Sequence, residues 1–205
     1  MCLPGFLGDR RVFEPLAVLA HARFEVVTLD LPPGSPREAA LALPAVDGHY
    51  LTGSFGGLVA SCLPPSRLRS LALVATLPAA SLIPRSVRLQ SRLLRRLPAP
   101  ALEALYRRHS ARSLEQDGVD LESEGLDAVT LRARLRGVLE HDFVFPSVPL
   151  LWVLGATDPQ APNSGDVLRH QPLAEVCHVP GGHRPYASHP GPLLTELERW
   201  WSSLG

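Results

Sequence analysis

Short apolar runs, separated by chain-breaking residues, recur along the sequence and predict buried strands. Residues 24–29 (FEVVTL) are rich in β-branched side chains and lead through Asp30 into the turn-forming stretch LPPGSP. Four further runs span 48–52, 68–76, 148–154 and 174–179. Mainly apolar runs of this length are typical of buried strands, so we expect a mostly parallel sheet.

Segments between these runs have helical character. The stretches REAALALPA (37–45) and GGLVASCL (56–63) predict short helices, and GPLLTELERWWSSLG predicts an amphipathic helix that closes the chain. Its apolar positions are Leu193, Leu194, Leu197, Trp200 and Trp201. Strands that alternate with helices indicate an α/β fold with helices on both faces of the sheet.

The middle of the chain interrupts this alternation. Residues 79–146 have apolar positions at helical spacing and no convincing strand. These positions are Val87, Leu93, Leu94 and Leu97, then Leu102, Leu105 and Tyr106, then Val129, Leu135, Val138 and Leu139. We therefore expect a single domain over 1–205, with a core made by 1–78 and 147–205 and an inserted helical lid over 79–146.

The sequence LTGSFGG places Ser54 between a predicted strand and a predicted helix. Such a tight strand-to-helix turn projects a serine hydroxyl above the sheet, and it needs small residues two positions before and after the serine. Here those positions hold Thr52 and Gly56. Alone this pattern also fits an ordinary turn or helix cap.

Two later loops supply the partners that a serine nucleophile needs. GATDPQAP follows the strand at 148–154 and contains Asp158, and PGGHRPYASHP follows the strand at 174–179 and contains His183. Both loops leave the carboxyl ends of their strands, where sites form in open α/β sheets. The order serine, acid, histidine is the one found in serine hydrolases of this architecture, so we predict a Ser54–His183–Asp158 triad.

These segments, together with LPGFLGDRRVF and VVTLDLPPG, resemble the α/β-hydrolase superfamily over nearly the whole chain outside the insertion. The resemblance implies an α/β-hydrolase fold, Ser54 as nucleophile, Asp158 as acid, His183 as base, and the backbone amides of Phe6 and Phe55 as the oxyanion hole. It also implies that the first strands of the fold are missing and the third is clipped, or that the start codon is assigned too late. Within the superfamily, GHRPYASHP and HDFVFPSVPLLWVLG are most similar to pimeloyl-acyl-carrier-protein methyl ester esterases.

The chain departs from the superfamily pattern at two places. Pro4 stands where most members have histidine, which changes the support of the oxyanion loop. Thr52 replaces the usual first glycine of the serine turn and is β-branched, which adds strain. Tyr186, three residues after His183, is a candidate for the substrate pocket.

Other titratable residues fit structural roles better. Asp30 is an alternative acid at the same edge of the sheet, but the turn that follows explains it more simply. We expect His189 to lie at the start of a helix. We expect Asp142 to cap a helix or to form an ion pair with a neighbouring residue. The remaining histidines show no paired metal-ligand spacing, so we expect no metal, and the triad needs no cofactor.

Composition indicates which classes of partner and which cell compartment are expected. The formal net charge is zero, with 20 basic and 20 acidic residues, which indicates neither nucleic acid nor a membrane as partner. All the basic residues are arginine, as a GC-rich genome would produce. The widely spaced Cys2, Cys62 and Cys177 indicate reduced thiols and a cytoplasmic protein.

Charge is unevenly distributed within the insertion. Eight arginines lie between 85 and 112 against the single acid Glu103, and acids follow at Glu115, Asp117, Asp120, Glu122, Glu124 and Asp127. A solvated face, or pairing between the two blocks, explains this pattern simply. An alternative is that Arg88, Arg92 and Arg95, at helical spacing, dock an acidic acyl carrier protein.

The sequence therefore predicts a serine hydrolase that cleaves a carboxylic ester or thioester of a small molecule. The resemblance to carrier-protein esterases adds a carrier-linked methyl ester as a candidate substrate. Two alternatives stay open at this stage. The same triad could serve a lyase like the menaquinone-pathway synthase, or the scaffold could be catalytically degenerate and act as a binding protein.

Overall fold

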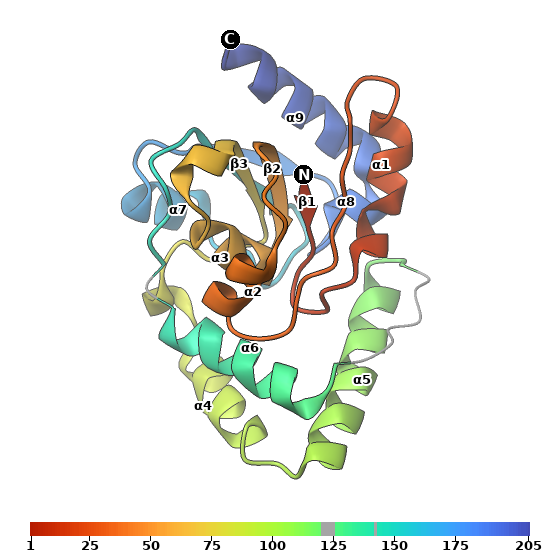
Figure 1. Ribbon diagram of the computed structural model, residues 1–205, viewed down its shortest axis with the longest axis vertical. Coiled ribbons are helices and arrows are strands. Elements are labelled where there is room, and N and C mark those ends of the chain that lie inside the picture. Colours follow the sequence, from red (N-terminus) through yellow and green to blue (C-terminus); the bar gives the residue numbers. More distant parts are fainter. Residues whose placement is uncertain (120–125, 142) are drawn as a thin grey trace.

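The computed structural model describes residues 1–119, 126–141 and 143–205 and is built around one parallel sheet (Figure 1). Its strands lie side by side in chain order, and every neighbouring pair is parallel. They are β1 (Cys2–Leu3), β2 (Gly48–Gly53), β3 (Leu68–Val74), β4 (Leu150–Gly155) and β5 (Glu175–Val179). The predicted strands at 48–52, 68–76, 148–154 and 174–179 are thus confirmed.

The predicted strand at 24–29 is wrong as a full strand. Only Thr28 forms a bridge, to Cys2, supported by hydrogen bonds from Cys2 N to Val27 O (2.8 Å) and from Leu29 N to Cys2 O (3.2 Å). The neighbour available to this segment is β1, which is two residues long. A β-branched run needs a partner of matching length to form a ladder, and this partner is too short.

Helices cover both faces of the sheet (Figure 1). They are α1 (Glu14–Ala20), α2 (Pro36–Ala42), α3 (Phe55–Ser61), α4 (Arg85–Leu94), α5 (Ala99–Gln116), α6 (Ala128–Glu140), α7 (Ser164–His170), α8 (Pro185–Ser188) and α9 (Pro190–Ser203). The predicted helices at 37–45, 56–63 and the C-terminus appear as α2, α3 and α9. A capping box between Ser35 and Glu38 starts α2.

Alternate strand residues divide the core into two layers. Leu71 and Leu73 of β3 pack with the cluster that includes α2, α3 and α7, whereas Ala72 and Val74 pack with the cluster that includes α1 and α9. This is the period of two that a strand imposes on its side chains. Both faces are apolar, as expected for a parallel sheet buried on both sides.

The helices α4, α5 and α6 lie together below the sheet in the view of Figure 1. The buried residues of α6 include Leu131, Arg134 and Gly137, whereas Val129, one of the apolar positions at helical spacing, is 76% exposed. Gly137 explains the shift of the buried face, because a Cβ there would lie 2.3 Å from Cδ of Pro36. The helix therefore turns its smallest residue and an arginine toward the core.

Three more of the apolar positions at helical spacing in the insertion are exposed, namely Val87, Leu93 and Leu105. Asp120, Glu122, Glu124 and Asp142 lie outside the described residues, so their predicted roles stay predictions. Across the described ranges, none of the helices is both long and apolar enough to cross a membrane.

Candidate active site

Ser54 occupies a strained corner between β2 and α3. Its backbone angles are φ 46° and ψ −111°, in a region that non-glycine residues rarely adopt. The corner is fixed from both sides, because Ser54 N donates to Val74 O (2.7 Å) and Ser54 O accepts from Gly57 N and from Thr76 Oγ1, each at 3.0 Å. The surrounding hydrogen bonds hold the serine in a conformation that the chain would not otherwise choose.

Small residues around Ser54 allow this close packing. A Cβ at Gly56 would lie 2.4 Å from Pro4 O, and one at Gly57 would lie 2.4 Å from Thr76 Oγ1. Thr52, the departure from the superfamily pattern, is fully buried and donates from Oγ1 to Ala72 O at 3.2 Å. Its hydroxyl is thus satisfied within the sheet, and the turn forms without the usual glycine.

His183 and Asp158 are joined by a hydrogen bond of 2.9 Å between Nδ1 and Oδ2. An ionised carboxylate only accepts, so Nδ1 carries the hydrogen and Nε2 of the neutral ring is left as an acceptor. The Asp158 side chain is fully buried, and Oδ1 accepts a second bond from Gln160 N at 2.9 Å. This pair has the orientation of a base held by an acid.

The pKa of Asp158 lies below its ordinary value although the group is buried. Burial by itself raises this pKa, but the hydrogen bond and charge of His183, the Gln160 amide and the nearby charge of Arg184 outweigh it. Asp158 is therefore ionised at neutral pH, as a carboxylate that orients an imidazole must be.

The loops that carry Asp158 and His183 are fastened to each other. Thr157 N donates to Gly181 O at 3.0 Å, and Ala156 N donates to Val179 O at 2.9 Å. At Gly155 a Cβ would lie 2.0 Å from Gly182 O, so only glycine fits at this contact. Backbone contacts rather than side chains thus set the separation between acid and base.

The Phe6 and Phe55 amides are placed as two free donors. Neither donates a hydrogen bond to an acceptor in the described ranges of the chain, and Phe55 opens α3, where amides have no partner inside the helix. The two rings meet edge to face with centroids 5.5 Å apart. Free amides beside a serine are what binding of a developing oxyanion requires.

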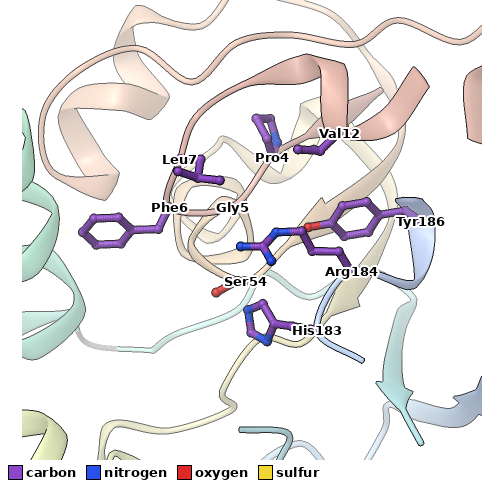
Figure 2. A pocket seen from close by; sticks show the side chains of 9 residues that line it. All are labelled: Pro4, Gly5, Phe6, Leu7, Val12, Ser54, His183, Arg184 and Tyr186. Atoms are coloured by element: carbon purple, nitrogen blue, oxygen red, sulfur yellow. The ribbon is translucent and has the colours of Figure 1, made fainter. Parts of the chain in front are cut away.

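Ser54 and His183 line one cavity of about 50 Å³, together with the loop 4–7, Val12, Arg184 and Tyr186 (Figure 2). Figure 2 shows the Ser54 hydroxyl beside the ring of His183. Within the described residues the two groups share no hydrogen bond, and such bonds often form only when substrate binds. The structure thus brings together all of the predicted site residues.

Tyr186 packs behind the serine. A Cβ at Gly53 would lie 2.6 Å from the Tyr186 hydroxyl, and the ring lies 4.3 Å, centroid to centroid, from that of Phe13. Burial raises the pKa of Tyr186 to about 12, so its hydroxyl stays protonated at neutral pH.

Two alternatives from the sequence lie elsewhere. Asp30 is 62% exposed and pairs with Arg10, accepting from Arg10 N at 2.8 Å. His189 stands at the N-cap position of α9 without a side-chain hydrogen bond to that helix, and its Nδ1 contacts Ser188 Oγ at 3.0 Å. Neither contacts His183 or lines the cavity, so the carboxylate on the imidazole is that of Asp158.

Sequence reasoning missed Arg134, a fully buried arginine on α6. Its Nη1 donates to Phe6 O, and its Nη2 donates to Leu31 O and Pro32 O, each at 3.1 Å. The guanidinium carbon lies 5.5 Å from the centroid of the Phe55 ring. Burial lowers the pKa of Arg134 to about 10, which leaves it charged at neutral pH. Arg134 therefore ties the helical insertion to the loop that carries the Phe6 amide.

A second tether, Arg184, joins the His183 loop to α5. Arg184 Nη1 donates to Ser113 O (3.2 Å), to Ser113 Oγ (2.9 Å) and to the buried carboxylate of Asp117. Composition does not distinguish either residue, because all 20 basic residues of the chain are arginine. The one available signal was Arg134 itself, at the i+3 position from Leu131 on an otherwise apolar helix face.

Solved structures show which fold this is. The chain is similar to an esterase from Thermogutta terrifontis (TM-score 0.73, 19% identity, covering 99% of this chain and 89% of that one). It is also similar to a hydrolase from Oleispira antarctica (TM-score 0.74, 13% identity, 98% and 89%) and to the enol-lactonase from Burkholderia xenovorans LB400 (0.69, 15%, 98% and 90%). The chain has the α/β-hydrolase fold.

Comparisons of sequence alone give no match. No protein-family profile and no curated protein matches this chain. At identities below 20% the structural likeness establishes the fold, and the chemistry has to be argued from the site.

Proposed function

We propose that this protein is a serine hydrolase that cleaves a carboxylic ester or thioester through an acyl-enzyme. The observation that carries this proposal is the Ser54 corner facing a histidine whose Nδ1 is bound to a buried carboxylate. The esterase and lactonase of the same fold agree with this reaction class.

The proposed reaction assigns one role to each of these groups. Ser54 Oγ attacks the carbonyl carbon while His183 Nε2 takes its proton, and Asp158 stabilises the imidazolium. The Phe6 and Phe55 amides bind the oxyanion of the tetrahedral intermediate. When this intermediate collapses, the alcohol or thiol leaves with the proton from His183. Water, activated by the same histidine, then releases the acid and restores the serine.

Labelling with a fluorophosphonate tests the proposal directly. We expect modification at Ser54, mapped by mass spectrometry, and turnover of short p-nitrophenyl esters. If neither labelling nor turnover occurred, the scaffold would be a binding protein instead. Failure on all esters with turnover of a dianionic diene precursor would favour the lyase.

The narrower resemblance to carrier-protein esterases stays a prediction. Arg88 donates to Ile83 O at 3.1 Å and Arg95 lies 3.7 Å from Glu140, so both serve the insertion itself, whereas Arg92 is exposed. Charge reversal at Arg92 is thus the cleanest test of docking. It should slow turnover of a carrier-linked ester and spare a small ester.

A further inference from the structure

Arg184 lines the cavity that contains Ser54, and its guanidinium is one of the side chains drawn around that cavity (Figure 2). Its hydrogen bonds to Ser113 and Asp117 all use Nη1. Nε and Nη2 have no acceptor within the described ranges of the chain, and they form one edge of the planar guanidinium. A carboxylate accepts side by side from such an edge, in the strongest geometry that arginine offers.

No acidic side chain is among the residues that line this cavity. The lining is completed by the loop 4–7, Val12 and Tyr186, which are uncharged, beside Ser54 and His183. The two nearby carboxylates are both engaged, Asp117 on the Nη1 side of the guanidinium and Asp158 behind the imidazole. An anion in the cavity would therefore meet the N–H groups of a guanidinium, while the Asp117 carboxylate stays on the Nη1 side.

The size of the cavity limits what can reach Arg184. One water needs at least about 10–15 Å³ of such space, and the cavity offers about 50 Å³. It therefore has room for a group of a few heavy atoms, such as a methylene that carries a carboxylate.

We propose that Arg184 binds a carboxylate at the end of a short acyl chain, so that the preferred substrates are monoesters of short dicarboxylic acids. This inference rests on the proposed ester hydrolysis at Ser54. The Nε–Nη2 edge holds the carboxylate while the ester carbonyl lies at the serine. A neutral chain of the same shape leaves that edge unpaired within the cavity.

Two esters of matched shape test this preference. Monomethyl malonate and methyl 3-methylbutanoate differ in having a carboxylate or an isopropyl group, and acid release from both can be followed in a pH-stat. The quantity to compare is the ratio of kcat/KM for the anionic ester to that for the neutral ester. Intrinsic reactivity cancels when this ratio is compared between variants.

Four variants separate substrate binding from support of the fold. Arg184→Gln should lower the ratio by about 10- to 100-fold, the scale of lost charged hydrogen bonds. In the double variant Arg184→Gln with Asp117→Asn, two amides replace the buried ion pair, and the ratio should fall equally. Asp117→Asn alone keeps the guanidinium and should raise the ratio. Arg107→Gln removes an exposed charge from α5 and should leave the ratio unchanged.

The outcomes distinguish this inference from the function on which it rests. If Arg184→Gln and the double variant slow both esters alike, so that the ratio is unchanged, Arg184 is only a tether and the inference is overturned. If the wild type hydrolyses neither ester and resists fluorophosphonate, the proposed function itself has failed.

Discussion

Arg134→Met tests whether the helical insertion shapes the catalytic loop. The substitution removes a buried charge and the donors to three carbonyl oxygens, those of Phe6, Leu31 and Pro32. Each orphaned carbonyl costs about 1–3 kcal/mol, a gross loss of about 3–9 kcal/mol. Removal of the desolvated cation returns several kcal/mol, so we expect the free energy of unfolding to fall by about 2–4 kcal/mol.

Catalysis should suffer separately from stability. The Phe6 amide is one of two proposed oxyanion donors, and loss of one such donor lowers kcat by about 10²–10³-fold. A loosened loop misplaces the amide part of the time, so we expect kcat on a short p-nitrophenyl ester to fall by about 10- to 100-fold. KM should change little, because the amide acts mainly on the charge of the transition state.

Arg132→Met is the matched control on the same helix. Arg132 also donates to backbone carbonyls, those of Arg95 (3.2 Å) and Leu97 (2.8 Å), but these lie within the insertion. It should lower stability, measured by denaturant unfolding, without lowering kcat. If the two variants lose stability and both keep wild-type kcat at a temperature where they are folded, Arg134 does not position the oxyanion loop.

Three further predictions concern the serine, the acid and the pH dependence. Ser54→Ala and Ser54→Gly should both abolish turnover and fluorophosphonate labelling. The glycine variant should be the more stable of the two by about 1 kcal/mol, because glycine adopts a positive φ without strain. Equal stabilities of the two variants in denaturant unfolding would argue against strain at this position. Asp158→Asn should lower kcat by up to about 10⁴-fold, whereas Asp30→Asn, at an exposed ion pair, should be nearly silent in the same assay; the reverse result would move the acid to the earlier strand. Activity should rise with pH on the acid side, because the base must be neutral to accept the serine proton. The pKa of Asp158 is lowered from the ordinary value of 3.8, so the carboxylate is protonated, and the stability it contributes is lost, only as the pH falls below 3.8. A pH–rate profile in which protonation of Asp158 lowers the rate above pH 5 would contradict this assignment.

The sheet was predictable because its signal is local. The run at 148–154 is apolar throughout, and the run at 68–76 is apolar from Leu71 to Ala75. These two apolar segments pair with each other in the structure. The run at 24–29 carries the same signal and yet forms a single bridge, since the two-residue β1 limits its ladder. Strand propensity is visible in the residues themselves, whereas the length of the partner is not.

The positions of Ser54, Asp158 and His183 were predictable because each of these residues follows a predicted strand. Ser54, Asp158 and His183 each follow a strand, and parallel strands bring their carboxyl ends to one edge. Arg134 and Arg184 escaped prediction for a different reason. Their partners are far away in sequence, namely the carbonyls of Phe6, Leu31 and Pro32 and the side chain of Asp117. Nothing in the sequence distinguishes a buried arginine from the other arginines among the 20.

The two arginine tethers also bear on how this protein can be re-engineered. Insertions between strands are often exchanged between enzymes of one fold as if they were independent modules. Here α6 holds the loop 4–8 through Arg134, and α5 holds the His183 loop through Asp117. A chimera that imports foreign helices in place of 79–146 would leave the Phe6 carbonyl without its donor and the Arg184 guanidinium without its acid. Exchange of this segment therefore has to carry over the residues at 117 and 134, or redesign the loops that carry Phe6 and His183 with it.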